Sequence, residues 1–378
     1  METNRLLDFI QLISTDGIGP VSFYKYLQKY GAPSEALKAL AQKKEIFPRH
    51  LAENELKNAQ KNNIKILTFE DVAYPLSLKQ LNDAPPLLYV KGDESFLNYP
   101  ACVSIVGSRN ASVAGRKIAS RIAYDLTNSD VLIVSGLARG IDSAAHKGAL
   151  YAKDQLGPTV AVLGTGVDVC YPEENQDLYD QIASHGAIIS EFALDTKANI
   201  SNFPRRNRIV SALSLGVLVV EASLNSGSLI TARLAMEQGK DVFAVPGSPL
   251  ENKSAGCNKL IKDGAFLTES ADDVLQTLAL TQNQTLKTAQ NATLKSKPLD
   301  FEKKEVNIVP KQKAAPKSVE VLNIIGSSGI ETDELIRHLE MPTGDVFALI
   351  TELELDGLIT KQNSSFLSLT KQGLRSLK

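Results

Sequence analysis

The segment Phe203-Pro-Arg-Arg-Asn-Arg-Ile209 gathers three arginines, an asparagine and an aromatic ring into seven positions. The whole chain has a formal net charge of only −2 at pH 7, so positive charge concentrated in this way favours an anion-binding site over general solubility. Guanidinium groups also match the geometry of a phosphate better than ammonium groups do. The alternative interpretation is a solvated, salt-bridged start of a helix. Because neither Arg205 nor Arg206 belongs to an apolar face, we expect both to be replaceable without loss of the fold.

Loops of similar composition follow several apolar runs of the sequence. The runs begin at residues 102, 131, 159, 216 and 241, and most of them end in Gly, Ser or Arg just before a stretch with helical periodicity. Continuous apolar strands that alternate with helices predict a parallel sheet covered on both faces. The loops at the carboxyl ends of such strands meet at one edge of the sheet. Five arginines are therefore expected to converge on one rim: Arg109, Arg139, Arg205, Arg206 and Arg208.

The glycines and serines of these loops suggest a second type of contact with phosphate. Backbone N–H groups at the start of a helix are unpaired and carry the positive end of the helix dipole, so they bind phosphate where no side chain blocks the approach. The candidates are Gly107, Ser108, Gly136, Gly140, Ser226, Gly227, Ser228, Gly247 and Ser248. For any single glycine, the alternative is a tight turn or a helix cap.

Familiar signatures of nucleotide enzymes and of metal sites are missing from the sequence. No Gly-x-Gly-x-x-Gly follows an expected strand, and Gly239-Lys240 lacks the other residues of a P-loop. The three cysteines are far apart and lack the spacing of metal ligands, and His146 fits packing on a helix face better than catalysis. We therefore expect no cofactor, no metal and no catalytic residue, which means that the protein is not expected to be an enzyme.

In these same segments the chain resembles the DNA processing protein A (DprA/Smf) family. The motifs that carry the resemblance are Ile105-Val-Gly-Ser-Arg109, Ser135-Gly-Leu-Ala-Arg-Gly-Ile-Asp142, Leu163-Gly-Thr-Gly166 with Tyr171-Pro172, Phe203 to Ile209, Ser226-Gly-Ser-Leu-Ile-Thr-Ala232, Val245-Pro-Gly-Ser248 and Gly256 to Ala265. They follow one another in order between about Tyr74 and Val274, so the match is more specific than any single motif.

The resemblance implies an extended Rossmann-like fold that binds single-stranded DNA along its phosphate rim and dimerises. It also implies protection of incoming DNA and loading of the RecA recombinase during natural transformation, without a demonstrated catalytic activity. Carried over residue by residue, the implied DNA contacts are Arg109, Phe203, Arg205, Arg206, Asn207, Arg208, Asn258 and Lys259.

The fold class expected for the whole chain is α/β, with an extended Rossmann-like parallel-sheet core between two smaller domains. We expect a helical domain at 1–62, a Rossmann-like DNA-binding domain at 63–280, a flexible linker at 281–317 and a winged-helix domain at 318–378. The linker is assigned from its Gln, Asn, Thr, Lys and Pro content. No export signal or membrane-spanning run is evident, so a cytoplasmic location without a membrane partner is expected.

The sequence does not decide the roles of the two smaller domains. Gly17-Ile-Gly19 breaks the first helical pattern and resembles the turn of a helix-hairpin-helix element, whereas the resembled family's N-terminal domain is described as sterile-alpha-motif-like. For this domain we favour packing or protein contact over direct DNA contact. The expected third helix of the winged-helix domain, at 343–356, carries four acids and no base, which argues against docking in a major groove. A protein-interaction or autoregulatory role is favoured instead.

Three function classes follow from these patterns. The first is a single-stranded DNA binder that loads a recombinase, the second is a nucleotide-binding or nucleotide-hydrolysing Rossmann-like enzyme, and the third is a winged-helix transcription factor. Five arginines on a rim suit a polyanion, whereas a site for a mononucleotide needs one or two together with a buried carboxylate. The acidic helix of the winged-helix domain disfavours the third class.

Overall fold

The computed structural model describes residues 2–155 and 157–279 and, in the C-terminal part, 316–326, 329–339, 341, 346, 349–350, 353, 358–361 and 366–370. The chain divides into two compact units, residues 1–296 and 297–378. The expected linker at 281–317 lies outside the described residues except for its last two positions. In the part of the chain that is described, no helix has the length and apolar character needed to cross a membrane.

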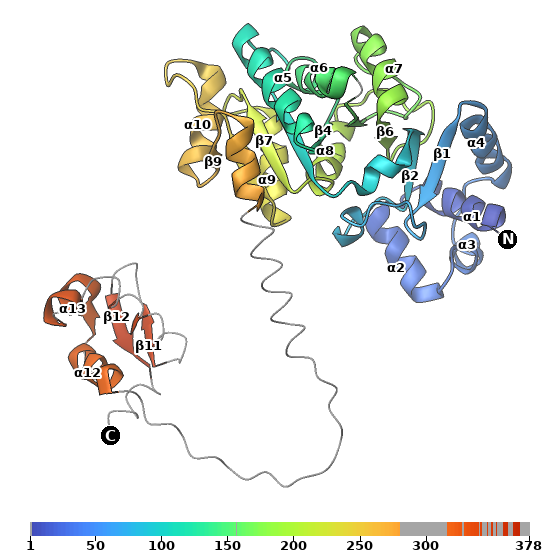
Figure 1. Ribbon diagram of the computed structural model, residues 1–378. Coiled ribbons are helices and arrows are strands. Elements are labelled where there is room, and N and C mark those ends of the chain that lie inside the picture. Colours follow the sequence, from blue (N-terminus) through green and yellow to red (C-terminus); the bar gives the residue numbers. More distant parts are fainter. Residues whose placement is uncertain are drawn as a thin grey trace. The chain divides into compact units, whose positions relative to one another are not determined.

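Four helices form the start of the first unit (Figure 1). They are α1 (Glu2–Ser14), α2 (Pro20–Tyr30), α3 (Pro33–Ala41) and α4 (Arg49–Lys61). Proline at the first position starts both α2 and α3, where its missing N–H costs no hydrogen bond, and Gly31 ends α2 with a φ of 78°. Phe9 and Phe23 are fully buried where α1 and α2 meet, with ring centroids 5.3 Å apart. The apolar periodicity of the first 60 residues therefore predicted the helices correctly.

The core of the first unit is a nine-stranded sheet in the order β1-β2-β6-β5-β4-β3-β7-β8-β9. Its strands are β1 (Ile64–Thr68), β2 (Leu87–Gly92), β3 (Cys102–Gly107), β4 (Leu132–Ser135), β5 (Thr159–Val162), β6 (Ala187–Ser190), β7 (Gly216–Val220), β8 (Asp241–Ala244) and β9 (Phe266–Leu267). β1 and β2 pair antiparallel with each other, β2 pairs antiparallel with β6, and the ladder from β6 to β9 is parallel. The predicted parallel-sheet core is thus confirmed, with two antiparallel strands added at one edge.

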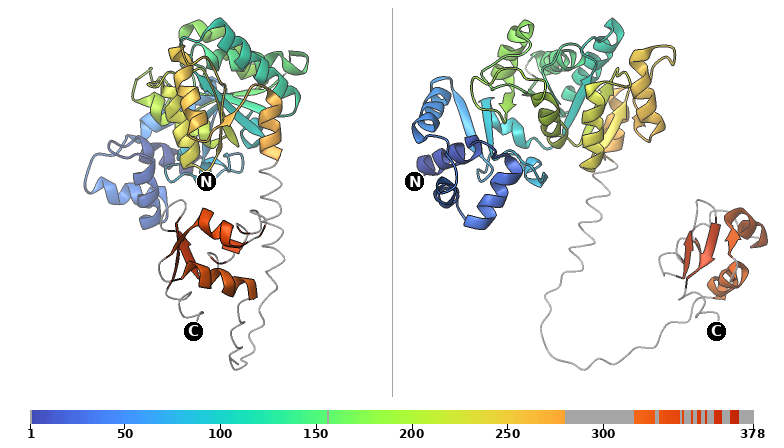
Figure 2. Two further views of the ribbon diagram at one scale, coloured as in Figure 1. Left: turned by 90° about the vertical axis from the view of Figure 1, so that its left-hand side faces the viewer. Right: turned by 180° about the vertical axis from the view of Figure 1, so that it is seen from behind.

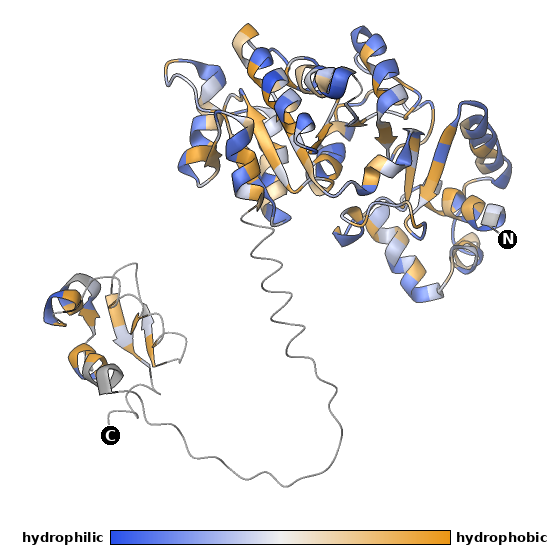
Figure 3. Cartoon of the chain, in the orientation of Figure 1, coloured by the Kyte–Doolittle hydropathy of each residue, from blue (hydrophilic) through white to orange (hydrophobic). Residues whose placement is uncertain are grey.

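Helices cover both faces of this sheet (Figure 2). They are α5 (Val113–Asn128), α6 (Ile141–Gln155), α7 (Gln176–His185), α8 (Asn202–Ala212), α9 (Gly227–Glu237) and α10 (Ala255–Lys262). In β3, Val103 and Ile105 pack in one apolar cluster with α5 and α6, while Val106 packs in another with α8 and α9. The central strands are accordingly among the most hydrophobic segments of the unit (Figure 3).

The strand order reverses direction at β3, which lies between β4 and β7. From β3 to β6 the chain advances toward one edge of the sheet, and from β7 to β9 it advances toward the other. The loops that follow β3 and β7 therefore diverge and leave a crevice at the carboxyl edge. In open α/β sheets, this is the usual position of a ligand site.

The second unit contains α12 (Pro316–Ile325), β10 (Ile330–Glu331), α13 (Thr332–His338), β11 (Ile359–Lys361) and β12 (Phe366–Leu369). Its three strands form an antiparallel sheet in the order β10-β12-β11, and its buried residues form a cluster of their own that includes Leu322, Leu335 and Leu367. The expected acidic helix at 343–356 lies mostly outside the described residues.

A chain that ends at Thr281 should fold, and the affinity for single-stranded DNA that we expect from the sequence should stay within about threefold, a change of about 0.6 kcal/mol. The reason is that the apolar clusters of the first unit and that of the second share no residue. Thermal melts and anisotropy titrations of the full and cut chains measure both properties. A tenfold loss of affinity would assign a DNA contact to the second unit.

Candidate nucleic-acid interface

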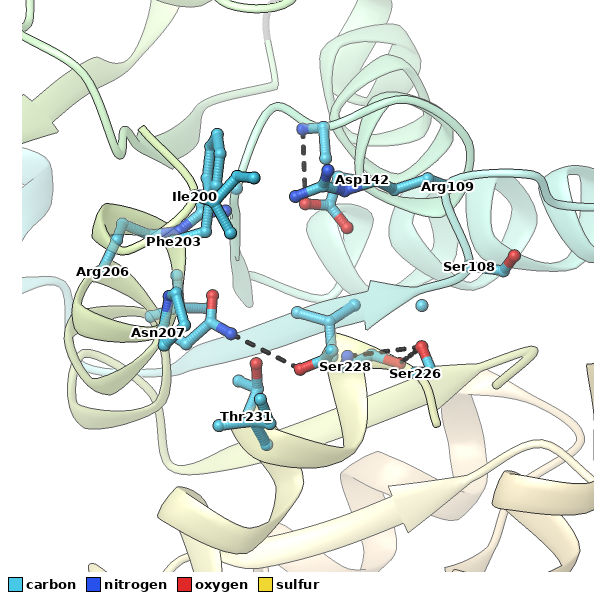
Figure 4. A pocket seen from close by; sticks show the side chains of 18 of the residues that line it. Ser108, Arg109, Asp142, Ile200, Phe203, Arg206, Asn207, Ser226, Ser228 and Thr231 are labelled. Atoms are coloured by element: carbon cyan, nitrogen blue, oxygen red, sulfur yellow. Dashed lines mark hydrogen bonds between the residues drawn. The ribbon is translucent and has the colours of Figure 1, made fainter. Parts of the chain in front are cut away.

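A pocket of about 690 Å³ lies at the crevice between the β3 and β7 loops (Figure 4). We call it the switch-point pocket. Its walls are the loops after β3 and β4 and the first turns of α8 and α9. Ten of the residues expected from the sequence line it: Gly107, Ser108, Arg109, Gly136, Phe203, Arg206, Asn207, Ser226, Gly227 and Ser228. Residues from segments about 100 positions apart are thus brought together as the parallel sheet predicts.

Arg109 and Phe203 form the mouth of this pocket. Arg109 is exposed, and its guanidinium lies 4.9 Å from the centroid of the Phe203 ring, a distance at which cation–π attraction holds the two together. The Phe203 ring is half-buried: its edge packs against Gly164, and its centroid lies 5.7 Å from that of Tyr171. The pocket therefore presents a positive charge on the Phe203 ring of α8, and Tyr171 from the loop after β5 packs against that ring.

Arg206 forms the floor of the pocket and is buried, with only 5 % of the residue exposed. Its Nη1 donates to the carbonyl of Val162, and the guanidinium fills the space that a side chain at Gly136 would need. Burial lowers the pKa of Arg206 to about 10, against the charge of Asp142, which raises it. This burial contradicts the reason for which Arg206 was expected to be replaceable, and we now expect its replacement to destabilise the fold. Its charge belongs to the interior of the domain.

Asp142 is the buried counter-charge of this floor. Burial raises the pKa of its carboxyl, and the positive charge of Arg206 acts in the opposite direction. The carboxylate also accepts a hydrogen bond from the Ala138 N–H at 3.4 Å, which ties the β4 loop to the start of α6. His146, one turn further along α6, is fully buried with Nδ1 2.9 Å from the Thr159 hydroxyl, and burial lowers its pKa to about 3. The packing role expected for His146 is confirmed.

The five arginines do not converge on one rim. Arg139 pairs with Glu174 at 2.7 Å and does not line the pocket. Arg208 is almost wholly buried and pairs with Glu191 at 2.5 Å and with Asp83 at 3.1 Å. Arg205 is half exposed, lies over the Phe192 ring at 5.1 Å and is 3.9 Å from Glu191.

Helical spacing within α8 explains why Arg205 and Arg208 do not face the same way as Arg206. Residues 203, 206, 207 and 210 recur at intervals of three and four and line the pocket, so they share one face of α8. Residues 205 and 208 share another face, which is turned toward α2 and the loop that contains Asp83. The composition of the segment indicated that the arginines are clustered in the sequence. It did not indicate that they point to two different faces of α8.

Several backbone amides expected to bind phosphate already have partners in the protein. The Ser108 N–H donates to the Glu221 carbonyl at 2.8 Å, which leaves the Ser108 hydroxyl as its polar group in the pocket. The Gly247 N–H donates to the Asn258 side chain at 3.2 Å. Gly227 differs from both, because no atom lies within 4 Å of the position that its Cβ would occupy. The start of α9, where the Ser226 hydroxyl caps the Ser228 N–H at 3.4 Å, is therefore open to an anion.

The remaining expected residues lie outside the switch-point pocket. Gly140 has a φ of 79°, and a Cβ there would collide with the Ser108 carbonyl, so it supports the β3 loop from behind. Lys259 pairs with Asp263 at 2.6 Å on α10. Four expected contacts, namely Gly247, Ser248, Asn258 and Lys259, belong to the β8 loop and α10 and do not line the pocket.

The other ten lining residues were not predicted as site residues, and they include the polar or exposed side chains of Asp142, Tyr171, Ile200 and Thr231. Thr231 follows Gly227 and Ser228 at the spacing of one helical turn, so the pattern of α9 contained its signal. Ile200 is 87 % exposed beside the pocket, in an irregular segment whose sequence has no periodicity.

Comparison with known proteins gives matches to three family models. They are DNA recombination-mediator protein A over residues 65–279, a DprA-like N-terminal HHH domain over residues 3–58 and a DprA winged helix domain over residues 309–363. The helix-hairpin-helix interpretation of the first helices and the winged-helix interpretation of the last unit are thereby confirmed.

Similar proteins include the DNA processing protein DprA of Streptococcus pneumoniae, 47% identical over 205 residues that cover 54% of this chain and 71% of that protein. Protein Smf of Escherichia coli is 35% identical over 327 residues, which cover 86% of this chain and 83% of that protein. The X-ray structure of DprA from S. pneumoniae matches with a TM-score of 0.61 and 35% identity, covering 73% of this chain and 96% of that one. A structure of DNA processing protein A from Helicobacter pylori, described for its single-stranded DNA binding mode, matches with a TM-score of 0.52 and 32% identity, covering 57% and 97%.

Proposed function

The chain belongs to the DNA recombination-mediator protein A (DprA/Smf) family, and from this premise we propose that its switch-point pocket binds single-stranded DNA. The observation that carries the proposal is the pairing of Arg109 with Phe203 at the mouth of the pocket. A flexible strand offers phosphates and unpaired bases at the same time. A guanidinium next to an aromatic ring serves both.

The start of α9 supplies the second half of the proposed contact. No side chain blocks the approach to the backbone at Gly227, the helix dipole places positive potential there, and Ser226 and Ser228 add hydroxyl donors. In this proposal, one phosphate lies between Arg109 and α9, and a neighbouring base stacks beside Phe203. Arg206 lies beneath this phosphate, where it holds the β4 loop in place and contributes positive charge to the floor of the pocket.

One observation favours a second candidate, a site for a free nucleotide. Arg109 and Arg206 with the buried Asp142 match the pattern of one or two arginines and a carboxylate expected for a mononucleotide. A volume of about 690 Å³ is also in the range of small-molecule sites. Against this candidate, Asp142 is engaged by a backbone N–H and by the charge of Arg206, which leaves it little capacity for catalysis.

Ligand competition decides between the two candidates. Oligo-dT should bind more tightly than a duplex of equal length, because a duplex hides the bases that Phe203 would stack. Thymidine monophosphate, ATP and NAD should not displace oligo-dT at millimolar concentration. The measurement is a fluorescence anisotropy titration with labelled oligo-dT and unlabelled competitors. Displacement by a mononucleotide at micromolar concentration would favour the second candidate, and equal affinity for duplex would contradict the single-strand proposal.

Family membership also supports proposals about what surrounds this binding step. We propose that the protein protects incoming DNA in the cytoplasm, loads the RecA recombinase onto it during natural transformation, acts as a homodimer and catalyses no reaction of its own. A winged-helix transcription factor is the weaker interpretation, because the match to recombination-mediator protein A covers residues 65–279.

A further inference from the structure

A second groove, of about 440 Å³, adjoins the switch-point pocket. Pro204 and Ile230 line both hollows and form the ridge between them. The far wall of the second groove is the first turn of α2, including Val21 and Ser22, which the chain contributes almost 200 residues before α8. We call it the α2 groove. The surface from Arg109 to α2 is therefore continuous, although the N-terminal helices and the sheet core are far apart in sequence.

The charge of the α2 groove suits a polyanion. Its lining has two arginines, Arg205 and Arg208, and one carboxylate, Asp83. Arg208 is neutralised by its buried pair with Glu191 and by Asp83. The Arg205 side chain is 52 % exposed, and its guanidinium lies over the Phe192 ring.

Three helices border the groove; α2 and α8 add no negative charge, and the one acid of α9, Glu237, is paired with Arg233. Neither α2 nor α8 contains an aspartate or glutamate, whereas α2 carries Lys25 and Lys29. Lys25 is exposed and follows Val21 by four residues, so both lie on the same side of α2. A strand that crosses the groove would meet Arg205 first and Lys25 next.

Apolar side chains on the rim suit the bases of a single strand. Val21 is 48 % exposed and Ile230 is 39 % exposed, on opposite walls of the groove. Unpaired bases gain by covering such surface, and a duplex keeps its bases stacked inside. Both the charge and the apolar surface thus favour single-stranded over double-stranded nucleic acid.

We propose that a single strand bound in the switch-point pocket continues over Pro204 and Ile230 into the α2 groove, where Arg205 contacts its phosphates, and then passes Lys25, which lies one helical turn beyond the lining residue Val21. This inference rests on the proposed function and extends it to the N-terminal helices. A neighbouring hollow on the other side of Arg205 offers the strand an alternative route, which its charge disfavours. That hollow is lined by the carboxylate of Glu55, and Arg205 is the one basic residue in its lining, so the strand follows the exposed side of α2.

The test compares a short and a long oligo-dT, of about 4 and about 20 nucleotides, on the full chain. The variants are Lys25→Glu and Arg205→Ala. The matched control is Lys57→Glu, which makes the same charge change at an exposed position of α4, a helix that contributes no residue to the switch-point pocket or to the α2 groove. For the long oligonucleotide, Lys25→Glu should weaken binding about fivefold and Arg205→Ala about threefold, and each should make the slope of log K against log salt shallower by about 0.7. The short oligonucleotide should bind all four proteins alike.

The outcomes separate this inference from the proposal on which it rests. If the unaltered chain binds neither oligonucleotide, the proposed function fails. If it binds both but Lys25→Glu and Lys57→Glu have the same effect on the long one, the strand does not reach α2 and the inference is overturned. A loss confined to duplex DNA in Lys25→Glu would overturn it as well, because the groove would then serve a duplex.

Discussion

Replacing Arg206 with glutamate should destabilise the first unit by about 3–5 kcal/mol and lower its melting temperature by about 10 °C. Arg206 is 5 % exposed, donates to the Val162 carbonyl and faces Asp142. A glutamate would lose that hydrogen bond and would place a second carboxylate beside the first in a buried site. Two like charges that share a buried site cannot both stay ionised without a large cost.

The matched control is Arg205→Glu, one position earlier on the same helix. The Arg205 side chain is half exposed and 3.9 Å from Glu191, so solvent screens the new repulsion and the loss should stay below about 1 kcal/mol. Circular dichroism melts of both variants and the unaltered chain measure the difference. Equal melting temperatures for the two variants would mean that Arg206 is not held in the interior.

The sheet was predictable because its strands are buried on both faces. Runs such as 102–107 and 216–220 are apolar almost without interruption, and the only arrangement that hides such runs between helices is a parallel sheet. The meeting of the β3 and β7 loops followed from that topology. The two antiparallel strands at the edge, β1 and β2, were less evident, because Lys65 and Lys91 interrupt their apolar pattern.

The division of the arginines could not be predicted from composition. Arg205, Arg206 and Arg208 have the same charge and neighbouring positions, yet one is half exposed, one fills the space above Gly136, and one is buried against Glu191. What decides among them is which face of α8 meets the sheet. That depends on tertiary packing over segments that no local pattern connects.

The role of a glycine could not be predicted from the sequence either. Gly136 lies in the loop before α6 and Gly227 is the first residue of α9, and the sequence predicted both as phosphate contacts. The space beside Gly136 is filled by Arg206, whereas that beside Gly227 is empty. A glycine marks a place where something approaches the backbone closely, and only the structure shows whether that is a side chain or a site for a ligand.

Arg109→Ala should lower the affinity for oligo-dT by tenfold or more, with little change in the melting temperature. A charge-assisted hydrogen bond contributes about 1.5–3 kcal/mol, and tenfold corresponds to about 1.4 kcal/mol. Arg109 is exposed and lies over Phe203 rather than inside the core, so its removal leaves no buried group without a partner. The slope of log K against log salt should become shallower by about 0.7, because one phosphate is no longer neutralised.

Phe203→Leu tests the other half of the same contact. Loss of one stacked base should cost about 1–3 kcal/mol, but the salt slope should not change, because leucine and phenylalanine are both neutral. Since the ring also holds Arg109 at 4.9 Å, the double variant should lose less affinity than the sum of the two single losses. Anisotropy titrations at several salt concentrations, with melts of all three variants, measure these terms. Strict additivity would show that the ring and the guanidinium act separately, and unchanged affinity with unchanged melting would place the DNA on another surface of the protein.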